Sequence, residues 1–133
     1  MGAVVSIAGD SFADYTKGLG RNTAIAASAY YTASYADFIT DFYRYLQKWR
    51  SETMFESNLD TITHHPSYRS IVAMGGRALP LIVGELRIAP SLLVYALEDI
   101  TGERPYAPNI QGDIRAMSDH WVLWSEREDA AAA

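Results

Sequence analysis

Cysteine is absent from the 133-residue chain. Its absence excludes disulfide bonds, thiolate metal sites and a cysteine nucleophile. A chain without cysteine is typical of a reducing compartment, and we predict a cytoplasmic location. We recognise no secretory signal, because the N-terminal MGAVVSIAG has no basic region before its apolar residues.

Basic residues are few. The chain has 11 lysines and arginines against 16 acidic residues, which gives a formal net charge of -5. This balance argues against a broad phosphate-binding surface. Basic and aromatic residues alternate in one stretch only, which we call the basic strip, from Tyr43 to Arg50. We do not expect the protein to bind nucleic acid through it.

A long uninterrupted apolar segment is also missing. The longest apolar stretch runs from Ala78 to Leu97, and it contains Pro80, Glu85, Arg87 and Pro90. Two prolines and two charges are incompatible with a continuous membrane-spanning helix. We therefore predict no membrane association.

Helical periodicity dominates what is present. From Asn22 to about Arg50, apolar residues recur at spacings of three and four, and no proline or glycine interrupts them. This pattern predicts one long N-terminal helix. We expect a flexible arm over residues 1–20, a single all-α domain over residues 21–128 and a frayed tail over residues 129–133.

The region from His65 to Glu103 predicts three short helices in succession. Prolines stand at their predicted starts and glycines at their ends: Pro66, Pro80, Pro90, Gly75 and Gly102. Links this short require the helices to pack as neighbouring antiparallel pairs. A last helix is predicted from about Asp113 to Glu128, with an apolar stripe that includes Trp121 and Trp124.

The central region resembles a HEAT-type helical repeat. The residues that carry the resemblance are Met74, Gly75, Ala78, Leu79, Pro80, Leu81, Ile82, Glu85 and Leu86, followed by the Thr-Gly-Glu turn at 101–103. The segment from His65 to Ile71 before them is similar to that of a group of small bacterial proteins. The resemblance implies an all-α fold, with the long N-terminal helix packed on a short HEAT-like stack of antiparallel helices. Such units present surfaces for recognition and imply no catalysis.

The first half of the long helix is rich in alanine, serine and tyrosine, a composition that favours close contact with a partner. The predicted interface consists of Tyr30, Tyr31, Tyr35, Phe38 and Phe42. The alternative is that this face covers the core of its own chain. We predict a non-catalytic protein-interaction module, one component of a bacterial toxin–antitoxin or mobile-element system. The partner is a second protein or, in a homodimer, a second copy of the chain.

The adjacent histidines His64 and His65, with Asp60 four residues before His64, form a candidate polar site. The alternative function is therefore a small nucleic-acid- or nucleotide-acting enzyme or toxin that uses this turn. The simpler interpretation is that His65 caps the helix that Pro66 starts. Adjacent histidines seldom ligate one metal and the HExxH spacing is absent, so we predict no metal, no cofactor and no catalytic residue.

Two further groups of residues receive structural interpretations. The adjacent acids Glu98 and Asp99 lie near a predicted helix end, where negative charge is unfavourable, and we expect them to pair with Arg104, Arg77 or Arg87. Met54 and Phe55 are expected to anchor the segment after the long helix to the core.

Overall fold

The computed structural model describes residues 21–132, and their side chains from residue 34 onward. Within this part of the chain every regular element is helical, which confirms the predicted all-α class. The α-helices are α3 (Arg21–Glu52), α4 (Leu59–Thr63), α5 (Pro66–Ala73), α6 (Leu79–Ile88), α7 (Leu93–Thr101) and α8 (Ile114–Ala132); the 3₁₀ helices are η1 (Gly75–Ala78) and η2 (Pro108–Ile110). The predicted arm over residues 1–20 lies outside the described residues.

The chain divides into two compact units between Arg44 and Tyr45, within α3. The first unit contributes the greater part of α3. The second contains the last turns of α3 and all later helices. None of the described helices combines the length and the apolarity that crossing a membrane needs.

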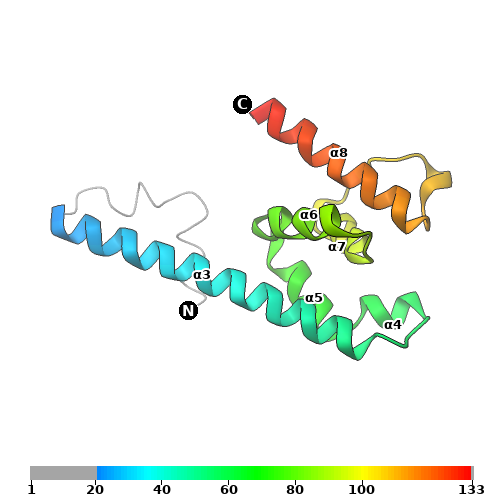
Figure 1. Cartoon of the computed structure of the whole chain (residues 1–133), viewed down its shortest axis with the longest axis horizontal. Helices are drawn as coiled ribbons and strands as arrows, with labels where there is room; N and C mark the ends of the chain where they lie inside the picture. The colour runs from blue at the N-terminus through cyan, green and yellow to red at the C-terminus, as the bar shows by residue number, and fades with distance from the viewer. Residues whose placement is uncertain (1–20, 133) are drawn as a thin grey trace. The chain divides into compact units, whose positions relative to one another are not determined.

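The core of the second unit forms where α5 packs on α7 and where α6 packs on both α7 and α8. Figure 1 shows α6 and α7 between α5 on one side and α8 on the other. The sequence predicted packing between successive helices, but η1 turns the chain after α5, so α5 packs mainly on α7. The fully buried side chains include Tyr68, Ile71, Ile82, Leu93, Leu97, Met117 and Trp121.

Trp49 joins the last turns of α3 to the helices that follow. Its indole nitrogen donates a hydrogen bond to the backbone carbonyl oxygen of Ile62, at 2.9 Å. Its ring packs against that of Tyr68, with 5.3 Å between the ring centroids. Only 3% of Trp49 is exposed, so this side chain belongs to the core. One side chain thus connects α3, α4 and α5.

Proline and glycine mark most helix ends as predicted. Pro66 occupies the first turn of α5, and Gly75 and Gly102 follow α5 and α7 with φ angles of 72°. The predicted role of Pro90 is wrong, because α7 begins only at Leu93. The backbone before Pro90 is extended at Ala89, as the residue before a proline prefers, and the Ser91 hydroxyl accepts the Leu93 N–H at 3.1 Å.

The last helix, predicted from about Asp113, begins at Ile114. The Asp113 carboxylate accepts the backbone N–H of Ala116 at 3.1 Å. Met117 and Trp121 on the predicted stripe are completely buried. The helix continues to Ala132, beyond the predicted end near Glu128. Alanine has the highest helix propensity, which accounts for the extension through the alanines after Asp129.

Gly102 and Gly84 differ in backbone conformation, since Gly102 is left-handed and Gly84 lies inside a right-handed helix. Replacing each of them by alanine therefore tests this fold. Gly102→Ala places a side chain in the left-handed region and should lower the free energy of unfolding by about 1–2 kcal/mol. Gly84→Ala, inside α6 with no atom within 4 Å of the added Cβ, should raise it by up to about 1 kcal/mol. Urea unfolding followed by circular dichroism measures both changes. Shifts of the same sign would contradict the assigned conformations.

Candidate functional site

The His65 side chain is a helix cap. Its Nδ1 atom accepts the backbone N–H of Ser67 at 3.0 Å, and its Nε2 atom lies 2.8 Å from a carboxylate oxygen of Glu52. An Nδ1 atom that accepts a hydrogen bond has no proton, so the neutral tautomer with its proton on Nε2 fits both contacts. The interpretation of His65 as the cap of α5 is confirmed.

The other members of the candidate polar site do not converge on His65. The exposed His64 ring lies with Nδ1 2.6 Å from the backbone carbonyl oxygen of Asp60. The Asp60 carboxylate bonds neither ring. His120 packs instead against Tyr106, with 5.9 Å between ring centroids. Among the described residues, no three histidine or acidic side chains are grouped closely enough to hold a metal ion.

The adjacent acids of α7 both have partners, and the partner of Glu98 is one of those predicted. Glu98 pairs with Arg104 at 3.3 Å. Its carboxylate also accepts hydrogen bonds from the Tyr106 hydroxyl and, at 3.4 Å, from the Gln111 amide. With 9% of its side chain exposed, Glu98 is almost fully enclosed by these donors.

Asp99 has a partner that the sequence did not predict. Its carboxylate accepts the Tyr68 hydroxyl at 2.6 Å and pairs with Arg69 at 3.4 Å. Arg87, one of the partners expected for these acids, pairs instead with Glu126 on α8 at 3.0 Å. The acid pair of α7 therefore connects this helix to α5 through Asp99 and to the loop before α8 through Glu98.

Burial and acidic neighbours keep the tyrosines of these networks protonated. Burial, and then the hydrogen bond to Asp99, raise the pKa of the Tyr68 hydroxyl far above its ordinary value. Burial, and then the hydrogen bond to Glu98, do the same to the pKa of Tyr106. Both hydroxyls therefore act as hydrogen-bond donors that hold a carboxylate, which is a structural role.

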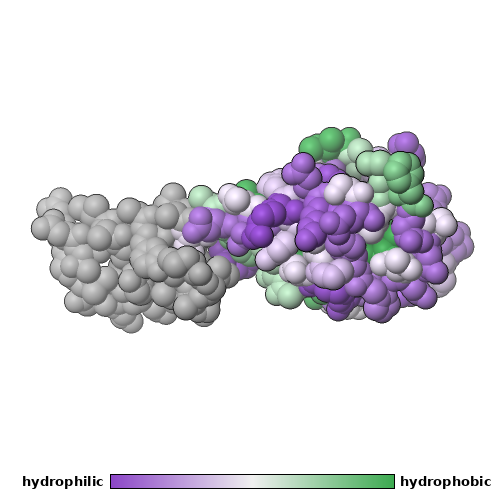
Figure 2. All heavy atoms as spheres, turned by 90° about the horizontal axis from the view of Figure 1, so that it is seen from below, coloured by the Kyte–Doolittle hydropathy of each residue, from purple (hydrophilic) through white to green (hydrophobic). Residues whose placement is uncertain are grey.

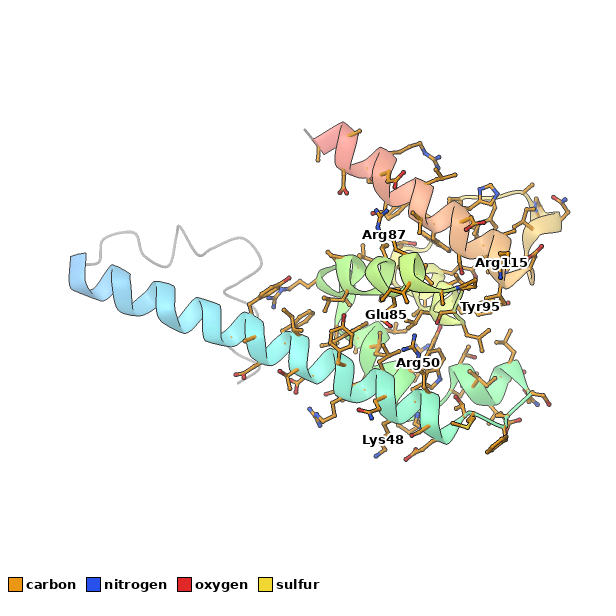
Figure 3. The ribbon with its side chains drawn as sticks, viewed as in Figure 1. Lys48, Arg50, Glu85, Arg87, Tyr95 and Arg115 are labelled. Atoms are coloured by element: carbon orange, nitrogen blue, oxygen red, sulfur yellow. The ribbon has the colours of Figure 1, made fainter. Side chains whose placement is uncertain are left out.

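Two of the three basic residues of the basic strip, Arg44 and Arg50, pair with nearby acids. Arg44 pairs with Asp41 at 2.6 Å. Arg50 of α3 and Glu85 of α6 point toward one another, as Figure 3 shows, and form an ion pair at 3.1 Å. With the ring of Trp49 buried as well, neither these two arginines nor this indole is available as an unpaired cation or a stacking surface for a nucleic acid.

The predicted tyrosine-rich interface is described only in part. The side chains of Tyr30 and Tyr31 lie outside the residues described. Tyr35 is 40% exposed and stacks on Phe38, with ring centroids 6.4 Å apart. Phe38 and Phe42 are buried, so they contribute nothing to an open face of α3. A partner interface on this helix stays a prediction.

The most exposed large apolar side chain belongs to a segment for which the sequence predicted the opposite role. Phe55 is 97% exposed and Met54 is 65% exposed, so their predicted contact with the core is wrong. Leu59 at the start of α4 is 39% exposed. Apolar side chains gather in only a few places on the mostly hydrophilic face in Figure 2. The sequence did contain a signal for their exposure, because Met54 and Phe55 stand between the acidic residues Glu52 and Glu56, as is typical of a surface segment.

Comparisons of the chain with protein-family models, with curated proteins and with solved structures found no match. The resemblance of the central region to a HEAT-type repeat therefore stays a prediction, and the function has to be argued from the residues themselves.

The cap assigned to His65 predicts a difference between the two adjacent histidines. His65→Ala removes the acceptor for the Ser67 N–H and should lower the free energy of unfolding by about 1 kcal/mol. His65→Asn, with a side chain that caps helices well, should recover part of this loss. His64→Ala at the exposed neighbour should change it by less than about 0.5 kcal/mol. Chemical unfolding measures these changes. Equal losses of unfolding free energy in His65→Ala and His64→Ala would show that the cap is not the cause of the loss.

The raised pKa of Tyr68 predicts how stability depends on pH. An unfolded tyrosine ionises near pH 10, whereas the folded Tyr68 keeps its proton at that pH, so unfolding releases a proton. The free energy of unfolding should therefore fall as the pH rises above about 10. Tyr68→Phe should be less stable at neutral pH but should lose less stability between about pH 8 and pH 11. Urea unfolding at the two pH values measures the change, and an unchanged pH slope would contradict it.

Proposed function

We propose that the protein is a non-catalytic interaction module that binds a protein partner through the turn after α3. The observation that carries the proposal is the exposure of Met54 and Phe55, 65% and 97%, in a turn that is held by backbone hydrogen bonds. We call residues 53–56 the Met54–Phe55 turn.

Hydrogen bonds hold this turn in place. The backbone N–H and the hydroxyl of Thr53 both donate to the carbonyl oxygen of Trp49, at 3.0 and 2.6 Å. The Glu56 N–H then donates to the Thr53 carbonyl oxygen at 3.0 Å. A preorganised turn loses little conformational entropy when it binds, so more of the contact energy is available for affinity.

The exposed side chains are of the type that contributes most to binding. Burial of a phenylalanine or methionine side chain against a partner is worth about 1.5–3 kcal/mol each. Aromatic residues and methionine are enriched at protein interfaces, while isolated exposed apolar residues on their own need no explanation. Two adjacent residues, with Leu59 on the following helix, therefore support an interaction surface.

The contacts of the histidine turn support the same choice of function. Both ring nitrogens of His65 are engaged at the start of α5, and the Asp60 carboxylate bonds neither histidine ring. A general base needs a nitrogen within reach of a substrate proton. The assignment to a toxin–antitoxin or mobile-element system, and the choice between a second protein and a second copy as partner, stay predictions.

Photocrosslinking from the turn tests the proposal. With p-benzoylphenylalanine at position 55, irradiation of cells that naturally produce the chain should give an adduct of one defined mass. The same residue at Gln47, an exposed position on α3, is the control and should not give that adduct. The partner identified by mass spectrometry should bind purified Phe55→Ser at least about tenfold more weakly than the unmodified chain.

The result can also contradict the proposal. The absence of an adduct specific to position 55, or equal affinity of the identified partner for Phe55→Ser, would exclude the Met54–Phe55 turn as the interaction surface. An adduct of two copies of the chain would identify a homodimer, which light scattering of the purified protein then has to show.

A further inference from the structure

A cleft lies between α6 and the C-terminal turns of α8. Its volume is about 440 Å³. Its floor is formed by the start of α6, where Leu79, Pro80, Val83 and Gly84 line it, and Trp124 of α8 lines its wall. Figure 1 shows α8 leading away from α6 toward its C-terminal end.

The outer rim of the cleft is negatively charged. Glu128 and Asp129 line it, and neither forms an ion pair or a hydrogen bond with a side chain in the described part of the chain. Arg87, which also lines the cleft and lies between α6 and α8 in Figure 3, is neutralised by Glu126 at 3.0 Å. The rim is thus left with two unbalanced negative charges.

These acids stand where a helix favours positive charge. The last turn of α8, as described to Ala132, has no basic residue. Acids near a helix C-terminus interact unfavourably with the helix dipole, which makes negative charge there a cost to the folded chain. A bound cation would relieve that cost, so the electrostatics of the rim complement a positively charged ligand.

We propose that this cleft binds a cationic amphipathic helix of a partner protein. The apolar side chains of that helix would pack on Leu79, Val83 and Trp124, while its lysines or arginines would face Glu128 and Asp129. This is the arrangement by which an amphipathic helix occupies a groove, with anchors one helical turn apart. The cleft shares no residue with the Met54–Phe55 turn, so the inference does not depend on that surface.

The floor of the cleft is shaped for the close approach of a helix. A Cβ atom added at Gly84 or at Gly76, which also lines the cleft, would meet no atom within 4 Å. The glycines therefore leave open space that the fold of the chain does not use. A glycine inside an exposed helix is unfavourable relative to alanine, and close approach of a ligand is a reason for its presence.

A designed peptide provides the probe. It is a helix of about 18 residues with leucines at helical spacing on one face and lysines beside them. A shuffled peptide of the same composition keeps the charge but has no apolar face. In fluorescence anisotropy at moderate salt, the helical peptide should bind the full chain saturably and the shuffled peptide at least about tenfold more weakly.

Two variants distinguish the cleft from general attraction to an acidic protein. Gly84→Leu fills the floor, and Glu128→Lys with Asp129→Lys reverses the rim; each should weaken binding of the helical peptide at least about tenfold. The matched controls are Gln47→Leu, and Asp37→Lys with Asp119→Lys, which make the same changes at exposed positions outside the cleft. The controls should bind as the unmodified chain does. Thermal unfolding should show that both cleft variants are at least as stable as the unmodified chain.

Several results would overturn the inference. Equal binding of the helical and shuffled peptides would assign the attraction to net charge alone. Unchanged affinity in Gly84→Leu, or in the charge-reversed rim variant, would place the peptide elsewhere. Light scattering that shows a dimer dissociated by Gly84→Leu would make a second copy of the chain the occupant and would replace the proposed cationic helix.

Discussion

The buried carboxylate of Glu98 is the interaction on which the arrangement of the last helices depends. A charge removed from water costs several kcal/mol unless hydrogen bonds and opposite charge compensate for it. Three donors surround this carboxylate: the Tyr106 hydroxyl, the Gln111 amide and the Arg104 guanidinium. All three belong to the loop between α7 and α8, so satisfying one charge holds the entire loop against α7.

The position of α8 follows from this loop. Tyr106 also packs edge-on against Trp121, with 6.3 Å between ring centroids, and Asp113 caps the first turn of the helix. Trp121 is completely buried, which directs the apolar face of α8 onto α6. The cleft then forms where α8 continues after this contact has ended. The hydrogen-bond network around Glu98 therefore determines where the acidic residues Glu128 and Asp129 lie.

The sequence predicted the structural features that depend on residues close together in the chain. The ends of α5 and α7, the cap at His65 and the apolar stripe of α8 each depend on residues within a few positions of one another. Most of what it missed depends on contacts between distant segments: the pairing of Asp99 with Arg69, and the cleft between α6 and α8. The start of α7 after Pro90 is the exception, because the nearby Ser91 hydroxyl accepts the Leu93 N–H there. Met54 and Phe55 are a different case, because their apolar character suggested burial although the acidic residues on either side, Glu52 and Glu56, indicated a surface segment.

The features that the fold does not need are the most informative about function. Burial of Trp49 and Tyr68 and the pairing of Glu98 and Asp99 account for how the second unit holds together. They do not account for an ordered apolar turn in solvent, for a helical glycine over open space, or for unpaired acids at the end of a helix. Each of these is unfavourable or neutral for the isolated chain and becomes favourable against a partner. Their occurrence on one small all-α chain is the physical reason to propose a role in binding.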